Sequence, residues 1–271
     1  MRRPFHLRVF AAFVSAASTM AVHAHDSWLR PAAVQPGAGL VQLELAVGPR
    51  YPQGEFAVAA SSIAGGACVE GASGQQRALL PREEQSRQLD LRSRADARQG
   101  LACWLELRPH VAEMTSDVVA AYFREIRAPE AAHQAWARQQ ARGVPWRESY
   151  RKSLRVEMPP PDTASAVPAA LRQTRGLALE IVPVGTAPLQ ARQPATFQVL
   201  LEGRPVAGQW VELVSDKGNA SVWSRSDAQG LVREVLPAAG QWLARATLLE
   251  PPAEDAQPWR SRFSTLVFHA R

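Results

Sequence analysis

His25 could bind a transition-metal ion if it becomes the first residue of a processed chain. The free α-amino group and the imidazole Nδ1 of one histidine can close a chelate ring on a single ion, and both nitrogens suit Cu(II), Ni(II), Co(II) or Zn(II). Because the amino group titrates at about pH 8 and imidazole at about 6.5, binding should strengthen as the pH rises through that interval. Asp26 follows directly and could add a carboxylate oxygen.

The residues ahead of His25 predict that processing occurs at this position. Three arginines lie within the first eight residues, residues 9–21 are uncharged and mostly small or apolar, and Val22-His23-Ala24 has the small-x-small pattern that signal peptidases cut. We therefore expect residues 1–24 to be a signal peptide cleaved directly before His25, which places the mature protein in the periplasm. Ordinary secretion and the twin-arginine route both stay open, because Arg2-Arg3 is similar to the twin-arginine pattern.

A second group of potential ligands lies in the first half of the mature chain. His110, Glu113 and Met114 bring an imidazole, a carboxylate and a thioether within five residues, and these donors suit copper, nickel or cobalt. His133 is interpreted more simply as a residue on a helix surface, and His269 as a residue of the last strand. Positions in the sequence do not establish that the ligands meet in space. The predicted metal ligands are His25, Asp26, His110 and Glu113.

Cys68 and Cys103 are the two cysteines of the sequence. Because an exported protein meets an oxidising environment, we expect them to form a structural disulfide. A bridge across their 35-residue separation would stabilise the fold by about 3 to 4 kcal/mol on the chain-entropy model. Two buried free thiols are the alternative, and a zinc site is disfavoured because neither a CxxC pair nor a suitably spaced histidine accompanies them.

Composition and motifs exclude several classes of function. The sequence has 31 basic and 25 acidic residues, and removal of the three arginines of the signal peptide leaves a net charge of +3. That balance predicts no nucleic-acid partner. Motifs for phosphate loops, dinucleotide binding, serine hydrolases and zinc peptidases are absent, so we do not expect an enzyme. No stretch after residue 24 is long and apolar enough to be a transmembrane segment.

A change in composition divides the mature chain into two predicted β domains. Residues 159–175 begin with three prolines and continue with small and polar residues, which predicts a surface linker. After it, residues 176–271 contain seven strand candidates separated by turn signals, which is typical of a sandwich of immunoglobulin or transthyretin type. The candidates are 177–182, 195–201, 210–214, 220–224, 231–235, 242–246 and 263–268.

The first domain, residues 25–158, is predicted to be β-sandwich-like, with a helical excursion over about 115–155. Strand patterns cover 41–47 and 102–107. The fold expected for the whole chain is therefore mainly β, in two sandwich-like domains.

Three helices are predicted within the excursion. The first has Thr115 or Ser116 as its N-cap and ends before Pro129. The second opens with Pro129 as its first helical residue and is stopped by Gly143. The third starts at Pro145, and its apolar face would carry Trp146, Tyr150 and Leu154.

The eight tryptophans could form either a stacking surface for sugars or another protein, or part of the core. Trp210 and Trp242 fall inside strand patterns and Trp146 lies at a helical spacing. Core packing is therefore the preferred interpretation for most of them.

The predicted mature N-terminus reads His25-Asp26-Ser27-Trp28-Leu29-Arg30-Pro31 and resembles an HD-x-W-L-x-P opening. Other segments that match the same family follow in order: Arg108-Pro109-His110, Tyr122-Phe123-Arg124-Glu125, Tyr150-Arg151-Lys152, 176–183, 201–208, 226–230 and 239–243. Together they resemble the domain of unknown function 4198, a family of exported bacterial proteins often labelled as periplasmic components of cobalt or nickel uptake. The sequence departs from that pattern at Thr247, near which relatives often carry His or Met.

The resemblance implies a periplasmic location and transition-metal handling. The first hypothesis is a carrier of nickel, cobalt or copper that is accessory to metal uptake, with a transporter or outer-membrane receptor as its partner. The alternative is a metal-free envelope β-sandwich module that binds a partner protein, a glycan or an outer-membrane receptor. A carrier needs the free amino group of His25, whereas a scaffold tolerates an extra residue before it.

Overall fold

The computed structural model describes residues 26–33, 39–161, 166–218 and 221–271. The predicted signal peptide, its predicted cleavage site and His25 lie outside the described residues. The first half contains β1 (Asp26–Pro31), β2 (Val41–Gly48), β3 (Phe56–Ala57), β4 (Ile63–Glu70), β5 (Gln76–Ala78), β6 (Leu80–Glu84), β7 (Gln88–Ser93), β8 (Leu101–Leu107), β9 (His110–Met114), α1 (Ser116–Glu125), α2 (Glu130–Ala141) and β10 (Trp146–Met158). The second half contains β11 (Glu180–Pro183), β12 (Pro194–Leu201), β13 (Arg204–Pro205), β14 (Trp210–Ser215), β15 (Ser221–Arg225), β16 (Leu231–Val235), β17 (Gly240–Glu250) and β18 (Trp259–Ala270).

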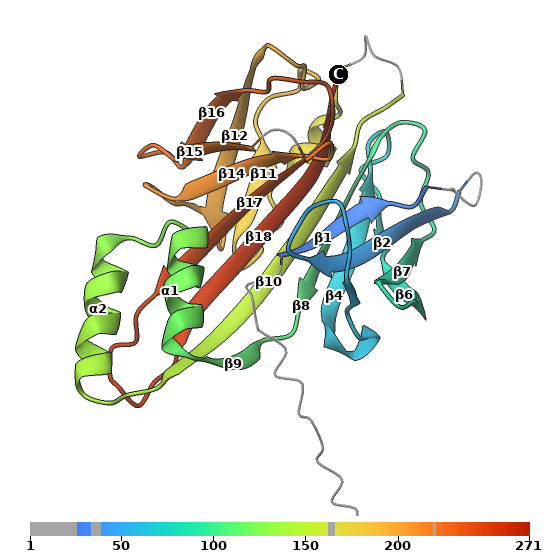
Figure 1. The fold of residues 1–271 in the computed structure, drawn as a ribbon. Helices are drawn as coiled ribbons and strands as arrows, with labels where there is room; N and C mark the ends of the chain where they lie inside the picture. The colour runs from blue at the N-terminus through green and yellow to red at the C-terminus, as the bar shows by residue number, and fades with distance from the viewer. Residues whose placement is uncertain (1–25, 34–38, 162–165, 219–220) are drawn as a thin grey trace, which may run out of the picture.

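Three sheets make up the described fold, which is mainly β as predicted (Figure 1). The largest has nine strands in the order β15-β14-β17-β18-β10-β8-β4-β5, with β9 paired to β10. A five-stranded sheet has the order β1-β2-β7-β6, with β3 on β2. A four-stranded sheet has the order β11-β12-β13, with β16 on β12.

The two smaller sheets cover opposite faces of the nine-stranded sheet. Along β17 and β18, Leu243 and Val267 pack with side chains of the five-stranded sheet, such as Leu43. Their chain neighbours Trp242 and Phe268 pack with side chains of the four-stranded sheet. Because successive side chains of a strand point to opposite faces, this alternation produces two sandwich-like cores that share one sheet.

The segments on either side of the predicted linker meet in that shared sheet. β10 precedes the linker and β18 ends the chain, yet they pair in parallel from Glu148↔Trp259 to Val156↔Val267. A parallel pair needs a long crossover connection, and here the whole second half of the chain supplies it. The two predicted units are therefore joined by a strand pairing as well as by the chain between them.

The linker prediction is wrong for its second part, because that part is buried. Val167 and Leu171 are almost completely inaccessible and pack against Val69 and Ala102 of the nine-stranded sheet. Arg172, at the end of a short 3₁₀ helix (Ala169–Arg172), is also buried and pairs with the Glu157 carboxylate of β10 at 2.8 Å. The proline and small-residue composition indicated the lack of regular structure but not this docking.

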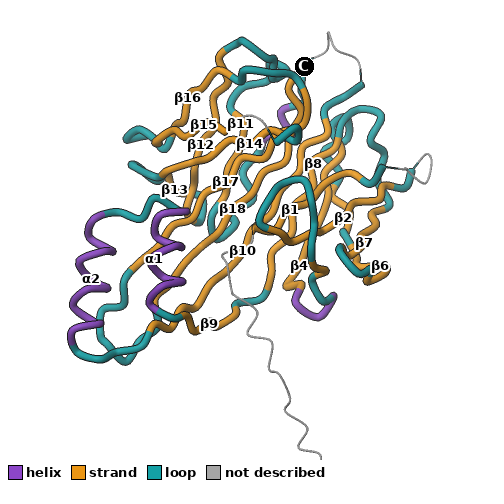
Figure 2. Tube along the Cα trace, in the orientation of Figure 1, coloured by secondary structure: helices purple, strands orange, loops and turns teal. Residues whose placement is uncertain are grey.

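The first two predicted helices are confirmed and lie side by side at one end of the molecule (Figure 2). Thr115 is the N-cap of α1, as predicted. For α2, Pro129 is the N-cap and Glu130 the first helical residue, so the predicted start is one residue early. Both helices pack their apolar sides on an aromatic cluster that includes Trp146 and Trp259.

The third predicted helix is wrong, since residues from Trp146 onward form strand β10. Trp146, Tyr150 and Leu154 are four residues apart, and that spacing fits one face of a helix as well as one face of a strand. Glu148 lies between the first two and is buried on the same side as Trp146, which is the period of a strand. The helical excursion therefore ends at Ala141 rather than near residue 155.

Most tryptophans belong to the core, as preferred from the sequence. Four of them, Trp28, Trp146, Trp242 and Trp259, are fully buried. Among the described residues, no helix is long and apolar enough to cross a membrane.

Candidate functional site

Asp26 is the first described residue and already belongs to the fold. It is 9% exposed and stands opposite Gly48 in the β1–β2 pair. The next residue, Ser27, is fixed from two sides: its carbonyl accepts a hydrogen bond of 2.7 Å from the Thr265 hydroxyl, and its Oγ accepts one of 3.3 Å from Lys152 Nζ. The beginning of β1 is thus held on strands β18 and β10.

The Asp26 carboxylate is engaged by Arg245 of β17. Arg245 Nη1 donates to Asp26 Oδ2, while Nε and Nη2 lie 2.6 and 2.5 Å from Glu212 Oε2 on β14. A third carboxylate, Glu125 Oε1 at the end of α1, lies 3.9 Å from Arg245 Nη1. Burial alone would lower the pKa of Arg245, but the charges and hydrogen bonds of Asp26 and Glu212 outweigh it and raise that pKa.

A small cavity adjoins this cluster. Its volume of about 20 Å³ is enough for one water molecule. The residues that line it are Asp26, Glu125, Ile126, Trp210, Trp223, Arg245, Ala246, Thr247 and Phe263. Thr247 therefore lines the same cavity as Asp26.

Arg127 stacks on the two indoles that line this cavity. Its guanidinium carbon lies 4.7 Å from the ring centre of Trp210 and 4.3 Å from that of Trp223. Such cation–π contacts favour a fixed position of the cation over the rings. Arg127 also has a positive φ of 51°, which a bulky residue rarely adopts. The chain just after α1 is therefore held against β14 and β15.

The buried carboxylate of Glu148 and the half-buried ammonium group of Lys152 lie next to the start of β1. Burial lowers the pKa of Lys152, and the negative charges of Asp26 and Glu148 act in the opposite direction. Burial raises the pKa of Glu148, although three donors favour its charged form. These donors are the hydroxyl groups of Ser261 and Tyr122 and the indole nitrogen of Trp146.

The other two predicted ligands lie on β9. The His110 ring is exposed and packs 5.4 Å from the ring of Tyr150, its partner in the β9–β10 pair. Tyr150 in turn contacts Lys152, whose Nζ lies 5.6 Å from the tyrosine ring centre, and Lys152 reaches Ser27. His110 and the start of β1 thus lie on the same face of the molecule, and the side chains of Tyr150 and Lys152 lie between them.

Glu113 points to a different partner, since its Oε1 lies 3.7 Å from Arg147 Nε and its side chain is 77% exposed. Within the described ranges, no group of three His, Cys, Asp or Glu side chains could hold a metal ion. Asp26, His110 and Glu113 are therefore not assembled into a site by themselves.

Sequence reasoning missed Arg245, Glu212 and Glu125 as neighbours of Asp26. Arg245 is 219 residues away in the chain, and no motif marks it among the many arginines. Only the packing of β1 on the nine-stranded sheet brings these residues together.

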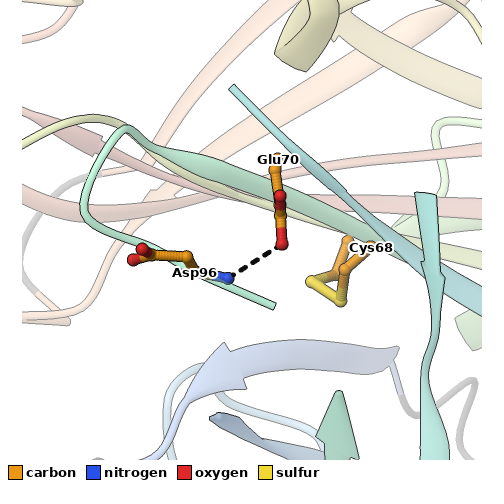
Figure 3. Close-up of a disulfide and its surroundings, with 4 residues drawn as sticks. Cys68, Glu70 and Asp96 are labelled. Carbon is orange, nitrogen blue, oxygen red and sulfur yellow. Dashed lines mark hydrogen bonds between the residues drawn. A yellow bond between two sulfur atoms is a disulfide. The ribbon is translucent and has the colours of Figure 1, made fainter. Parts of the chain in front are cut away.

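The disulfide prediction is confirmed (Figure 3). Cys68 of β4 and Cys103 of β8 face each other across the strand pair, with their sulfur atoms 2.07 Å apart. Close to them, the Glu70 carboxylate accepts a hydrogen bond of 3.1 Å from the backbone nitrogen of Asp96. The bridge is fully buried in the core below the five-stranded sheet.

Comparisons with known proteins give one family. A search of curated proteins finds no match. Among solved structures, a tetra-tandem repeat in the extending region of a large adhesion protein aligns with 90% of this chain and 49% of its own, at 10% identity and a TM-score of 0.21, which is too low to carry an argument. The chain thus spans about half the length of that structure. The model of the domain of unknown function DUF4198 matches residues 22–250, so this chain belongs to the DUF4198 family.

Proposed function

We propose that this protein is exported to the periplasm and binds one divalent transition-metal ion, nickel, cobalt or copper, through His25 as its first residue. The α-amino group and the imidazole of His25 are the nitrogen ligands in this proposal. The protein acts as a carrier or sensor for a metal-uptake system rather than as an enzyme. A membrane transporter or an outer-membrane receptor is the corresponding partner.

The observation that carries the proposal is the position of Asp26 in a paired, buried strand. If the signal peptide is removed before His25, a single residue separates the new amino group from a scaffold held by Thr265 and Lys152. A ligand attached to a fixed scaffold loses less conformational entropy when it binds an ion than one on a long tail. This favours a chelate at the first residue.

The local charge also supports a cation at this place. Four carboxylates, Asp26, Glu125, Glu148 and Glu212, and three cationic side chains, Arg127, Arg245 and Lys152, lie in or next to this cluster. The resulting charge of −1 attracts a divalent ion. The buried disulfide is consistent with export to an oxidising compartment.

The test is a calorimetric titration of protein that was secreted and cleaved by its own host, with the N-terminus verified by intact mass. Cu(II), Ni(II), Co(II) and Zn(II) are titrated separately. The matched control is the same mature protein with one additional Met before His25, which moves the α-amino group away from the imidazole but leaves every described residue unchanged.

The proposal expects one ion per chain with an affinity that the additional Met changes at least about tenfold, because the amino and imidazole nitrogens no longer belong to one residue and cannot close the same chelate ring. An order of affinities that departs from the general preference of nitrogen ligands for Cu(II) then identifies the metal that the site selects. Equal binding by both proteins, or no binding by either, would reject the site and favour the metal-free envelope module.

A further inference from the structure

We propose that Trp210 and Trp223 form a binding site for a small molecule with a guanidinium group, and that the side chain of Arg127 competes with that ligand for the site. The two indoles belong to β14 and β15, and neither is a metal ligand in the proposed function. The inference therefore goes beyond the proposed carrier and does not depend on it.

The two indoles form a corner that fits one planar cation. Their ring centres lie 6.5 Å apart and their planes meet at 75°. The guanidinium carbon of Arg127 lies 4.7 Å from the ring centre of Trp210 and 4.3 Å from that of Trp223, so both rings are close enough for a cation–π contact. These three distances place the two rings nearly at right angles as seen from the cation. Each indole is thus a separate wall, and the chemistry that fits between them is that of a guanidinium group.

Stacking alone holds the Arg127 guanidinium in this corner. The residue is exposed, and within the described part of the chain no carboxylate forms an ion pair with it. Arg245, in contrast, is fixed by the Glu212 carboxylate at 2.5 Å. The backbone of Arg127 has a φ of 51°, in the left-handed region that a bulky residue adopts only at a cost in energy. A free guanidinium compound makes the same two contacts without that cost and can therefore replace Arg127.

The charges next to the corner select for a cation. The adjoining cavity of about 20 Å³ is lined by both indoles and by Asp26 and Arg245. A cationic ligand that displaces Arg127 leaves the balance between these charges unchanged, whereas a neutral molecule of the same shape would remove one positive charge from it. Because the cavity has room for about one water-sized group beside the cation, a guanidinium with a small substituent fits best.

The experiment is a titration of the ¹⁵N-labelled mature protein with methylguanidinium chloride, followed through the indole N–H signals in NMR spectra. Trp210→Phe and Trp223→Phe assign the two signals of the corner. N-methylurea, which has nearly the same shape but no charge, is the control ligand, and NaCl at equal ionic strength controls for salt.

Three variants test the competition and the walls of the site. Arg127→Ala removes the competing side chain, and Arg124→Ala, the matched control, removes an exposed arginine of the last turn of α1 without touching the corner. Trp223→Leu, combined with Arg127→Ala, removes one wall. Urea unfolding of each variant establishes that it folds.

Methylguanidinium should shift both indole signals saturably and should bind Arg127→Ala about tenfold more tightly than wild type, because a side chain that fills the site about nine-tenths of the time lowers the apparent affinity by that factor. Arg124→Ala should bind as wild type does. Loss of the Trp223 wall should weaken binding by Arg127→Ala about fivefold or more.

Three results would each reject the proposal. The first is equal affinity of wild type and Arg127→Ala, and the second is a shift by N-methylurea as large as that by methylguanidinium. The third is the lack of a saturable shift in Arg127→Ala, which would show that Arg127 only fastens the end of α1 to β14 and β15. None of these outcomes involves a metal ion, so they leave the proposed function to its own test.

Discussion

The Cys68–Cys103 bridge allows a quantitative prediction of stability. It closes a loop of 35 residues between β4 and β8. On the chain-entropy model, such a loop restricts the unfolded chain enough to stabilise the native state by about 4 kcal/mol. For a chain of this size that corresponds to a decrease of about 8 to 16 °C in Tm when the bridge is opened. Because both cysteines are fully buried, alanine substitutions would add the cost of a cavity.

The assay therefore compares oxidised wild-type protein with wild-type protein that was reduced in denaturant and refolded under reducing conditions. Both samples keep the two sulfur atoms, so the difference in urea unfolding free energy isolates the covalent link. Thiol titration confirms the redox state of each sample. If the two unfolding free energies agree to within about 1 kcal/mol, the entropic reasoning for this loop is refuted.

Three further predictions follow from the described structure. Leu154→Ala should reduce the unfolding free energy by about 3 kcal/mol because Leu154 is buried in the core, whereas the exposed Arg151→Ala should change it by less than about 0.5 kcal/mol. Equal effects in urea unfolding would contradict the burial of Leu154. Glu180→Ala leaves the buried Arg155 without its carboxylate at 2.5 Å and should cost about 3 to 5 kcal/mol in urea unfolding, a loss that an exposed pair would not give. In NMR titrations, burial should lower the pKa of His269 below 6.5. The stability contributed by its neutral form is therefore complete above pH 6.5 and is lost as the pH falls through the lowered pKa. A measured pKa at or above 6.5 would contradict the position of His269 in the structure.

Local signals in the sequence were sufficient for most single elements. Thr115 as a cap and the apolar spacing after it located α1, and alternating apolar residues located strands such as β2 and β16. Trp146, Tyr150 and Leu154 misled because a spacing of four satisfies both the helical and the strand period. The burial of Glu148, between Trp146 and Tyr150, distinguishes a strand from a helix here. Because Glu148 is charged, the spacing of apolar residues in the sequence does not indicate that it is buried.

Long-range features were beyond reach because they depend on pairings between distant segments. Nothing local to β10 or β18 predicts that they form a parallel pair across the second half of the chain. The same holds for the candidate site, since Asp26 meets Arg245 only after β1 packs on the nine-stranded sheet. The sequence predicted the disulfide partners correctly and led to the hypothesis that His25 chelates a metal ion, whereas the charged surroundings of Asp26 required the structure.

The central claim is that the first residue of the mature chain provides the metal ligands. The most direct test is an electron paramagnetic resonance spectrum of the cleaved protein with one equivalent of Cu(II), recorded with and without ¹⁵N-labelled histidine. The account predicts hyperfine coupling to nitrogen that changes on labelling, and a different nitrogen pattern when one Met precedes His25, because the terminal amino group then no longer belongs to a labelled histidine. A spectrum with oxygen ligands only, or a nitrogen pattern that the additional Met leaves unchanged, would contradict it.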